Sequence, residues 1–261
     1  MARTRVFPNR RLYVLGKVLF STIGSFVRMQ SVHAQPVKHV QPSVQVWTAY
    51  YEQARVSNRW GATFDGQARR TDFLSRWATL IVRPGVVYYL SDYAQLSAGY
   101  AYARFYPAEG VGDVQPEHRL WQQIAWRSRF GRLETNYWLR AEERFRGNLD
   151  AGRRSNGYTF NWRFRLMTSA QLPLWGETVK PGVLGILLQN ELWINAGRAI
   201  TYNYFDQNRL FLGLVYPVST SFRLQAGYQN VFMQQPVGNV FQDKHVLRVF
   251  LYHALDLRKQ P

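Results

Sequence analysis

The sequence predicts an all-β protein, a single transmembrane β-barrel of antiparallel up-and-down strands. Apolar and polar side chains alternate along many segments, most of which are ten to fourteen residues long, and no segment beyond the N-terminal leader is an apolar stretch long enough for a spanning helix. The clearest alternation runs from Asn156 to Thr168, with the apolar positions on one parity and the polar positions on the other: Tyr158, Phe160, Trp162, Phe164 and Leu166 against Thr159, Asn161, Arg163 and Arg165. A period of two indicates a strand with one apolar and one wet face.

Residues 1–34 have the features of a cleaved signal peptide. A basic start precedes the apolar stretch Leu12–Val27, in which Lys17 is the one charge, and a small-residue pattern follows that ends at Ala34. A membrane anchor is the alternative, but charged residues leave too few uninterrupted apolar positions to span a bilayer. We expect cleavage after Ala34 and a barrel domain over residues 35–261.

Charge and composition narrow the class of protein. The net charge is +17, and subtracting the six basic residues of the leader, which has no acid, leaves +11. Of the 33 basic residues 28 are arginine, and they recur inside strands instead of forming a run. This spacing argues against nucleic acid as a partner and favours fixed ion pairs or anion contacts. Because the chain has no cysteine, disulfide frameworks and thiolate metal sites are excluded.

From Val44 onward, strand-like segments alternate with breakers. Soluble strands usually have five or six residues, whereas about ten tilted residues cross a bilayer. An open sheet would leave backbone groups unpaired in lipid, so a closed barrel is required. The expected strands are Val44–Val56, Trp60–Arg70, Trp77–Leu90, Tyr93–Tyr106, Glu117–Phe130, Arg132–Phe145, Gly157–Gln171, Val183–Asn195, Phe205–Pro217, Ser221–Met233 and Lys244–Leu255.

The connections alternate between short and long, as expected when short turns lie on one rim of a barrel and longer loops on the other. The short ones are Ser57–Arg59, Ser91–Asp92, Gly131 and Val218–Thr220. The long ones are Thr71–Arg76, Pro107–Pro116, Arg146–Asn156, Ala196–Tyr204 and Gln234–Asp243, and Leu172–Gly182 is long where a short turn is due. Because bacterial barrels have even strand counts, we expect twelve strands, the additional one within Gln35–Ser43, with ten as the fallback.

The polar parity predicts which side chains face the lumen. An arginine on the lipid face costs about 2–4 kcal/mol at the bilayer midplane, so a face with many mid-strand arginines must be the interior. The alternative is a soluble periplasmic barrel that binds an amphiphile in an aromatic interior and turns its arginines to water. The expected lumen residues are Asp65, Gln67, Arg69, Arg83, Glu117, Arg119, Gln123, Arg127, Glu134, Arg140, Glu142, Arg144, Arg163, Arg165, Glu191, Gln207, Arg209, Arg223 and Arg248.

These residues predict a function without catalysis. Acids share the interior parity with many arginines, and buried charges are tolerated when they are paired, which favours a structural ion-pair lattice. Since arginines outnumber acids, the lumen could also bind or pass anions. We therefore expect a structural or surface protein of the outer membrane, or a narrow arginine-lined pore for small anionic solutes, with no cofactor and no metal.

An outer-membrane lipid hydrolase or acyltransferase is the alternative from another class. His118 lies in a polar motif after a loop and could act as the base, but Ser128 is the one hydroxyl farther along on its parity and no partnered nucleophile is evident. His245 and His253 lie at opposite ends of one strand and form no ligand cluster. No glycine-rich phosphate loop and no nucleophile elbow is present.

A series of short motifs recurs along the strands: Trp47, Gln67-x-Arg69, Arg83-Pro84-Gly85 with Tyr88, Gly99-Tyr100, Glu117 to Gln123, Arg140 to Phe145, Arg163-Phe164-Arg165, Asn190-Glu191, Phe205 to Arg209 and Gly227-Tyr228. From about Trp47 to Leu255 these motifs resemble those of the bacterial DUF2490 family, a domain family of unknown function. The resemblance implies a Gram-negative outer-membrane barrel without an established activity, so that the expected partners are outer-membrane lipid, lipopolysaccharide and the barrel-insertion machinery. Many such barrels end on an aromatic residue that this machinery reads. Here the sequence runs on from Leu255 to Pro261, a departure that should lower the efficiency of insertion.

Overall fold

The computed structural model describes residues 37–107 and 111–258, and the expected leader lies outside them. No helix in the described residues is long and apolar enough to cross a membrane. The described residues are almost entirely strand, in agreement with the predicted all-β class. The strands are β1 (His39–Arg55), β2 (Trp60–Thr71), β3 (Arg76–Tyr89), β4 (Ala94–Phe105), β5 (Gln115–Phe130), β6 (Leu133–Asp150), β7 (Arg153–Pro173), β8 (Gly185–Ala196), β9 (Phe205–Pro217), β10 (Phe222–Gln234) and β11 (Val240–Asp256).

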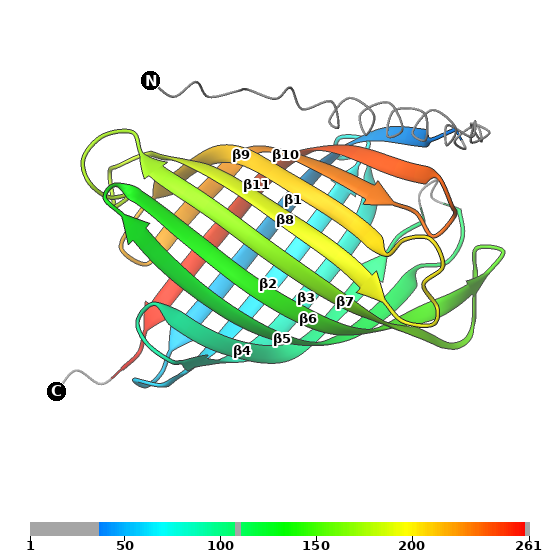
Figure 1. Ribbon diagram of the computed structural model, residues 1–261, viewed down its shortest axis with the longest axis horizontal. Helices are drawn as coiled ribbons and strands as arrows, with labels where there is room; N and C mark the ends of the chain where they lie inside the picture. Colours follow the sequence, from blue (N-terminus) through cyan, green and yellow to red (C-terminus); the bar gives the residue numbers. More distant parts are fainter. Residues whose placement is uncertain (1–36, 108–110, 259–261) are drawn as a thin grey trace, which may run out of the picture. The chain divides into compact units, whose positions relative to one another are not determined.

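These eleven strands of the described chain close into one barrel in sequence order (Figure 1). Each strand is antiparallel to its sequence neighbours, while β1 and β11 pair in parallel from His39↔Val240 to Arg55↔Asp256. The expected counts of twelve and ten strands are therefore wrong. An odd number of up-and-down strands makes the first and last run in the same direction, so closure requires one parallel pair.

Two strand boundaries also correct the sequence prediction. The described part of Gln35–Ser43, residues 37–43, holds no separate strand, because β1 begins at His39 and continues without a break. The expected loop Arg146–Asn156 is instead the end of a long hairpin, in which β6 and β7 are joined at Ala151 and Gly152. Both residues have positive φ angles, 45° and 79°, as a two-residue type I′ turn requires.

Apolar side chains inside the barrel stabilise the parallel seam between β1 and β11. Trp47 and Ala49 of β1 pack with Val246 and Phe250 of β11 and with Val231 of β10. Next to this cluster the rings of Tyr51 and Tyr252 stack with their centroids 4.7 Å apart. Parallel pairing is slightly weaker per residue than antiparallel pairing, and this buried cluster stabilises the seam.

The barrel has two rims, which we name by the strand ends that they contain. The C-terminal rim holds the end of β11 and the connections after odd-numbered strands, at residues 56–59, 90–93, 131–132, 174–184 and 218–221. The N-terminal rim holds the start of β1 and the connections after even-numbered strands, at residues 72–75, 106–107 with 111–114, 151–152, 197–204 and 235–239.

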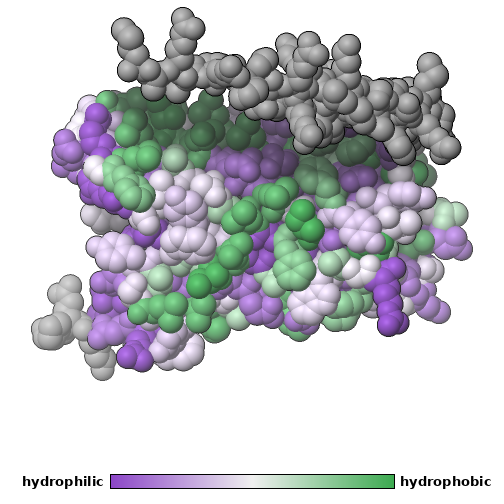
Figure 2. Space-filling model, in the orientation of Figure 1, coloured by the Kyte–Doolittle hydropathy of each residue, from purple (hydrophilic) through white to green (hydrophobic). Residues whose placement is uncertain are grey.

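The outer wall is apolar and the inner wall is polar. On β7 the side chains of Trp162 and Phe164 are 36% and 47% exposed, whereas the intervening Arg163 is 2% exposed and lines the interior. Figure 2 shows apolar side chains running obliquely over the middle of the wall that faces the viewer, with hydrophilic side chains gathered toward the ends. A surface with so many exposed large apolar side chains is typical of a membrane or protein interface.

The seam yields a stability prediction. Replacing Phe250 with Ala removes a buried ring from the cluster that spans β1 and β11, so the free energy of unfolding in detergent should fall by about 3–5 kcal/mol. Leu247→Ala, at a half-exposed position on the outer face of the same strand, is the matched control and should have a smaller effect. Circular dichroism during thermal unfolding measures both, and equal losses would contradict a stabilising role for the cluster.

Candidate functional site

The barrel encloses a cavity of about 1390 Å³ that reaches both rims. At the C-terminal rim its lining includes Asp92 and Ser219, and at the N-terminal rim it includes Tyr106, Asn203 and Gln235. Between these mouths, inward-facing side chains of all eleven described strands line it. This cavity is the candidate site.

The residues predicted to face the lumen lie along this cavity. Sixteen of the nineteen line it directly. The other three bind side chains that line it: Glu117 accepts from Arg119 and Arg144, Glu142 accepts from Arg163 and Arg165, and Glu134 accepts from Gln171. Strand parity therefore places the predicted set inside one enclosed space, from strands that are far apart in the sequence.

One carboxylate organises the interior near the N-terminal ends of β5 and β7. Glu117 on β5 is completely buried and accepts a bidentate pair from Arg144 on β6, with Nε to Oε1 at 2.9 Å and Nη2 to Oε2 at 2.8 Å. Arg119 also donates to Oε1 of Glu117. Fork-shaped guanidinium–carboxylate pairs of this kind fix both partners in position.

A second network continues across β6 to β9. Glu142 on β6 is completely buried, and its Oε2 accepts from Nε of Arg163 at 2.8 Å while its Oε1 accepts from Nη1 of Arg165 at 2.7 Å. Arg165 reaches onward to Glu191, with Nε to Oε1 at 2.8 Å, and Arg163 reaches Asp206 at 3.4 Å. Arg140 and Arg146 also form ion pairs with Glu142 and Glu117, each at 3.9 Å. The two networks thus pair four acids with six arginines, and we call the part formed by β5 to β8 and Asp206 of β9 the neutralised wall.

The strands beside the seam carry cations without carboxylate partners. Within the described residues, Arg69, Arg209, Arg223, Lys244 and Arg248 make no ion pair, and we call the inner surface that carries them the cationic wall. Arg69 and Arg209 donate to neutral amides, those of Gln67 and Gln207. The interior thus has one side on which acids offset much of the positive charge by ion pairs, and one side on which the cations have no ion-pair partner among the described residues.

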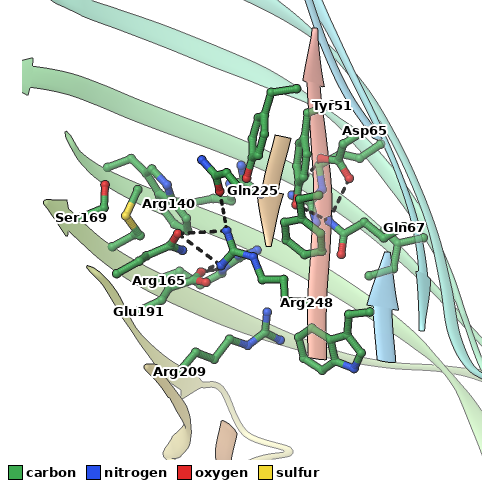
Figure 3. Close-up of a pocket in the computed structure, with 18 of the residues that line it drawn as sticks. Tyr51, Asp65, Gln67, Arg140, Arg165, Ser169, Glu191, Arg209, Gln225 and Arg248 are labelled. Atoms are coloured by element: carbon green, nitrogen blue, oxygen red, sulfur yellow. Dashed lines mark hydrogen bonds and ion pairs between the residues drawn. The ribbon is translucent and has the colours of Figure 1, made fainter. Parts of the chain in front are cut away.

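Arg248 crosses the lumen from β11 (Figure 3). Its Nη2 donates to Gln225 at 2.9 Å and its Nη1 to Gln229 at 3.2 Å, both on β10, and both nitrogens lie 3.4 Å from Oε1 of Gln189 on β8. The rings of Phe211 and Phe250 lie against the guanidinium, with centroids 3.9 and 4.3 Å from Cζ. The hydrogen-bond partners of Arg248 are neutral amides, so no ion pair with a described carboxylate offsets its positive charge.

Aromatic rings separate the inward arginines, and sequence analysis did not identify them. Trp193 lies against Arg163, Arg165 and Arg209, with Cζ to centroid distances of 4.3, 4.0 and 3.8 Å. The inward position of the tryptophans could have been predicted, because they have the same strand parity as the lumen arginines. Sequence analysis had instead assigned aromatic side chains to the outer face. Four such rings alternate with arginines in one chain: Arg69, Trp47, Arg209, Trp193, Arg165, Trp138, Arg140 and Trp121.

The long connection 174–184 narrows the mouth at the C-terminal rim. Val179 is buried against the inward-facing Leu187, Phe211 and Val215. Arg129 donates to the carbonyl of Glu177 at 2.8 Å, which holds the connection to the end of β5. The unexpected length of this connection therefore has a structural consequence, because part of it folds into the barrel.

His118 lies on the outer wall near the N-terminal rim, among tyrosines. Its Nδ1 is 2.5 Å from the hydroxyl of Tyr100 and its Nε2 is 3.4 Å from that of Tyr158. Ser128 lies ten residues away on the same strand, about 33 Å at 3.3 Å per residue, so the structure does not bring these two groups together. His245 and His253 also contact tyrosines, Tyr228 and Tyr50, on the outer wall.

No group of three or more histidine or acidic residues in the described chain has the arrangement of a metal site. The carboxylate oxygens of Glu117, Glu142 and Glu191, which are the kind of atom that binds a metal ion, form ion pairs with arginine guanidinium groups instead.

Comparisons with known proteins give a family but no activity. The family described as "Protein of unknown function (DUF2490)" matches residues 44–242. An uncharacterised protein of Methylorubrum extorquens is 29% identical over 192 residues, which cover 71% of this chain and 77% of that protein. No solved structure matches the chain significantly.

The ion-pair lattice formed by Glu117, Glu142 and their arginines yields a stability prediction, for which the adjacent residue Glu143 provides the control. Glu142→Gln leaves Arg163 and Arg165 buried with one carboxylate fewer, so the free energy of unfolding should fall by about 3–5 kcal/mol. Glu143→Gln, at the next position on the outer face, removes a carboxylate that has no hydrogen bond or ion pair to the described residues, and should change stability by less than about 1 kcal/mol. Denaturant unfolding in detergent micelles measures both variants. Similar values for the two would contradict the lattice.

Proposed function

The chain belongs to the DUF2490 family, whose description states no function, and we propose that it is an outer-membrane β-barrel forming a narrow pore for small anionic solutes. The observation that carries the proposal is the cavity that reaches both rims and has a cationic wall. Enclosed passages lined by arginine or lysine favour anions, because fixed positive charge replaces part of the hydration that the ion loses.

The outer surface supports a location in a membrane. Rows such as Leu188 on β8 with Leu210 and Leu212 on β9 are 47% to 56% exposed, and no polar group of the lumen reaches them. Aromatic pairs lie outside near both rims: Trp60 with Tyr88 at the C-terminal rim and Phe232 with Phe241 at the N-terminal rim. An apolar band between two aromatic girdles matches the two interfaces and the hydrocarbon layer of a bilayer.

The two interior walls would have different tasks in such a pore. The neutralised wall fixes β5 to β9 by ion pairs, and its carboxylates offset much of its positive charge. The cationic wall presents groups whose hydrogen-bonding capacity is only partly used; Arg248, for example, contacts three glutamine side chains and no carboxylate. An anion would therefore follow the cationic wall and avoid the carboxylates opposite.

A purely structural role is the second candidate, and the connection 174–184 favours it. Its Val179 packs inside the C-terminal mouth, which reduces the free cross-section there. In that case the lattice would stabilise a barrel whose outer surface and rims contact lipid or other molecules of the cell surface. Conductance separates the two candidates.

Ion selectivity in planar bilayers tests the pore. With a KCl gradient, the wild-type chain should give a reversal potential that indicates anion preference, and Arg248→Gln should shift it toward zero because a central positive charge is lost. Arg59→Gln, at the C-terminal rim and outside the cavity lining, is the matched control and should leave it unchanged. Absence of conductance at every polarity, or cation preference in the wild type, would overturn the pore and leave the structural role.

A further inference from the structure

We propose that Arg69, Arg209 and Lys244 form a binding subsite for a small multivalent oxyanion, with inorganic phosphate as the simplest member of the class. The subsite lies on the cationic wall, on the side of the N-terminal rim. The inference deepens the proposed function by naming the solute class that the lumen would hold, and it is tested by binding instead of conductance.

The strand register and a shared ring relate the three cations to one another. Val231 on β10 is paired with Arg209 on β9 and also with Lys244 on β11, so these two basic residues flank it at one level of the barrel. Arg69 on β2 is paired with Trp47 on β1, and the ring of Trp47 lies against both Arg69 and Arg209. All three basic side chains line the cavity.

Trp47 holds the two guanidinium groups in position. The Cζ atom of Arg69 is 3.9 Å from the ring centroid of Trp47, and that of Arg209 is 5.0 Å from it. The indole Nε1 donates to Oε1 of Gln45 at 2.7 Å, which fixes the ring itself. Two arginines against one anchored ring are preorganised, so less conformational freedom is lost when they bind a ligand.

The donors of this cluster are largely unused. Arg69 donates from Nη2 to Gln67 at 2.7 Å, and its buried Nε has no hydrogen-bond partner. Arg209 donates from Nε to Gln207 at 3.0 Å, and Lys244 makes no hydrogen bond to any described residue. Since each guanidinium has five N–H donors and an ammonium has three, most of the donors of this cluster are not used by the described residues.

The nearest acids are engaged elsewhere. Glu191 binds Arg165 and Asp206 binds Arg163, and no ion pair joins either acid to the three cations. On the neutralised wall, by contrast, a buried arginine has acidic partners: Arg165 forms ion pairs with both Glu142 and Glu191. Three cations that form no ion pair with a described residue are therefore a place where a ligand can supply a bound negative charge.

The chemistry of the donors selects the ligand class. Guanidinium forks match the paired oxygens of phosphate or carboxylate groups, and the lysine adds a mobile point charge. Three positive charges favour a dianion over a monovalent anion of similar size. The position inside a polar lumen favours a free solute over a lipid headgroup, whose acyl chains would have to enter the same space.

The test uses the purified full chain in detergent, titrated by calorimetry with inorganic phosphate, acetate or a short-chain phospholipid. Phosphate should bind saturably with one site per chain, and acetate should bind much more weakly. Lys244→Gln and Arg209→Gln should each weaken phosphate binding by about tenfold or more, as the loss of a charge-assisted hydrogen bond predicts. Arg223→Gln removes an unpaired lumen cation elsewhere on the cationic wall, so it should weaken binding much less, and only through the general field of the lumen. Arg59→Gln, outside the cavity lining, should leave the affinity unchanged.

Three results would overturn the subsite: no saturable phosphate binding, equal affinity for phosphate and acetate, or equal weakening by Arg223→Gln, which would indicate only the general field of the lumen. Preferential binding of the phospholipid would overturn its assignment to a free solute. Variants that lose the barrel are identified by circular dichroism, and ³¹P line broadening with the wild-type chain then tests the site without substitution. If the wild-type chain binds phosphate but conducts no current, the subsite proposal stands and the pore proposal is overturned.

Discussion

Ion pairing between buried guanidinium and carboxylate groups is the interaction on which this barrel depends. Two inward-facing acids, Glu117 and Glu142, have no exposed surface, and each binds two arginines. Glu117 on β5 binds Arg119 of its own strand and Arg144 of β6, and Glu142 on β6 binds Arg163 and Arg165 of β7. Buried charge is costly unless it is paired and hydrogen-bonded. Because most of these pairs join adjacent strands, the pairs that offset the charges also fix the register of the wall.

The distribution of these pairs gives the interior its polarity. Acids concentrate on β5 to β9, while the strands around the parallel seam present cations that contact amides and aromatic rings. The seam itself is stabilised by apolar packing around Trp47 and Phe250, so its basic residues are not needed as ion-pair partners. The ion pairs that stabilise the barrel and the cations without ion pairs thus lie in different parts of one cavity. The proposed anion-binding lumen requires this separation.

Strand parity predicted most of the architecture and the lumen set, because a two-residue period fixes the face of every side chain once one face is known. It could not predict the strand number: pairing of β1 with β11 depends on contacts over some 200 residues, and the rule of even counts was misleading. The hairpin ending at Ala151 and Gly152 was missed because polar residues in a protruding hairpin resemble a loop. The inward position of Trp47 and Trp193 was overlooked because aromatic residues were associated with lipid.

The account rests on an outer face in lipid and an inner face in water, and adjacent positions on β5 test it most directly. Ile124 is 38% exposed on the outer wall, while Ala125 lines the cavity, and the chain has no cysteine of its own. In liposomes, Ile124→Cys should react with a membrane-soluble maleimide and be protected from a small charged one, and Ala125→Cys should show the opposite. Reaction of Ile124→Cys with the charged reagent, together with protection of Ala125→Cys, would contradict the account.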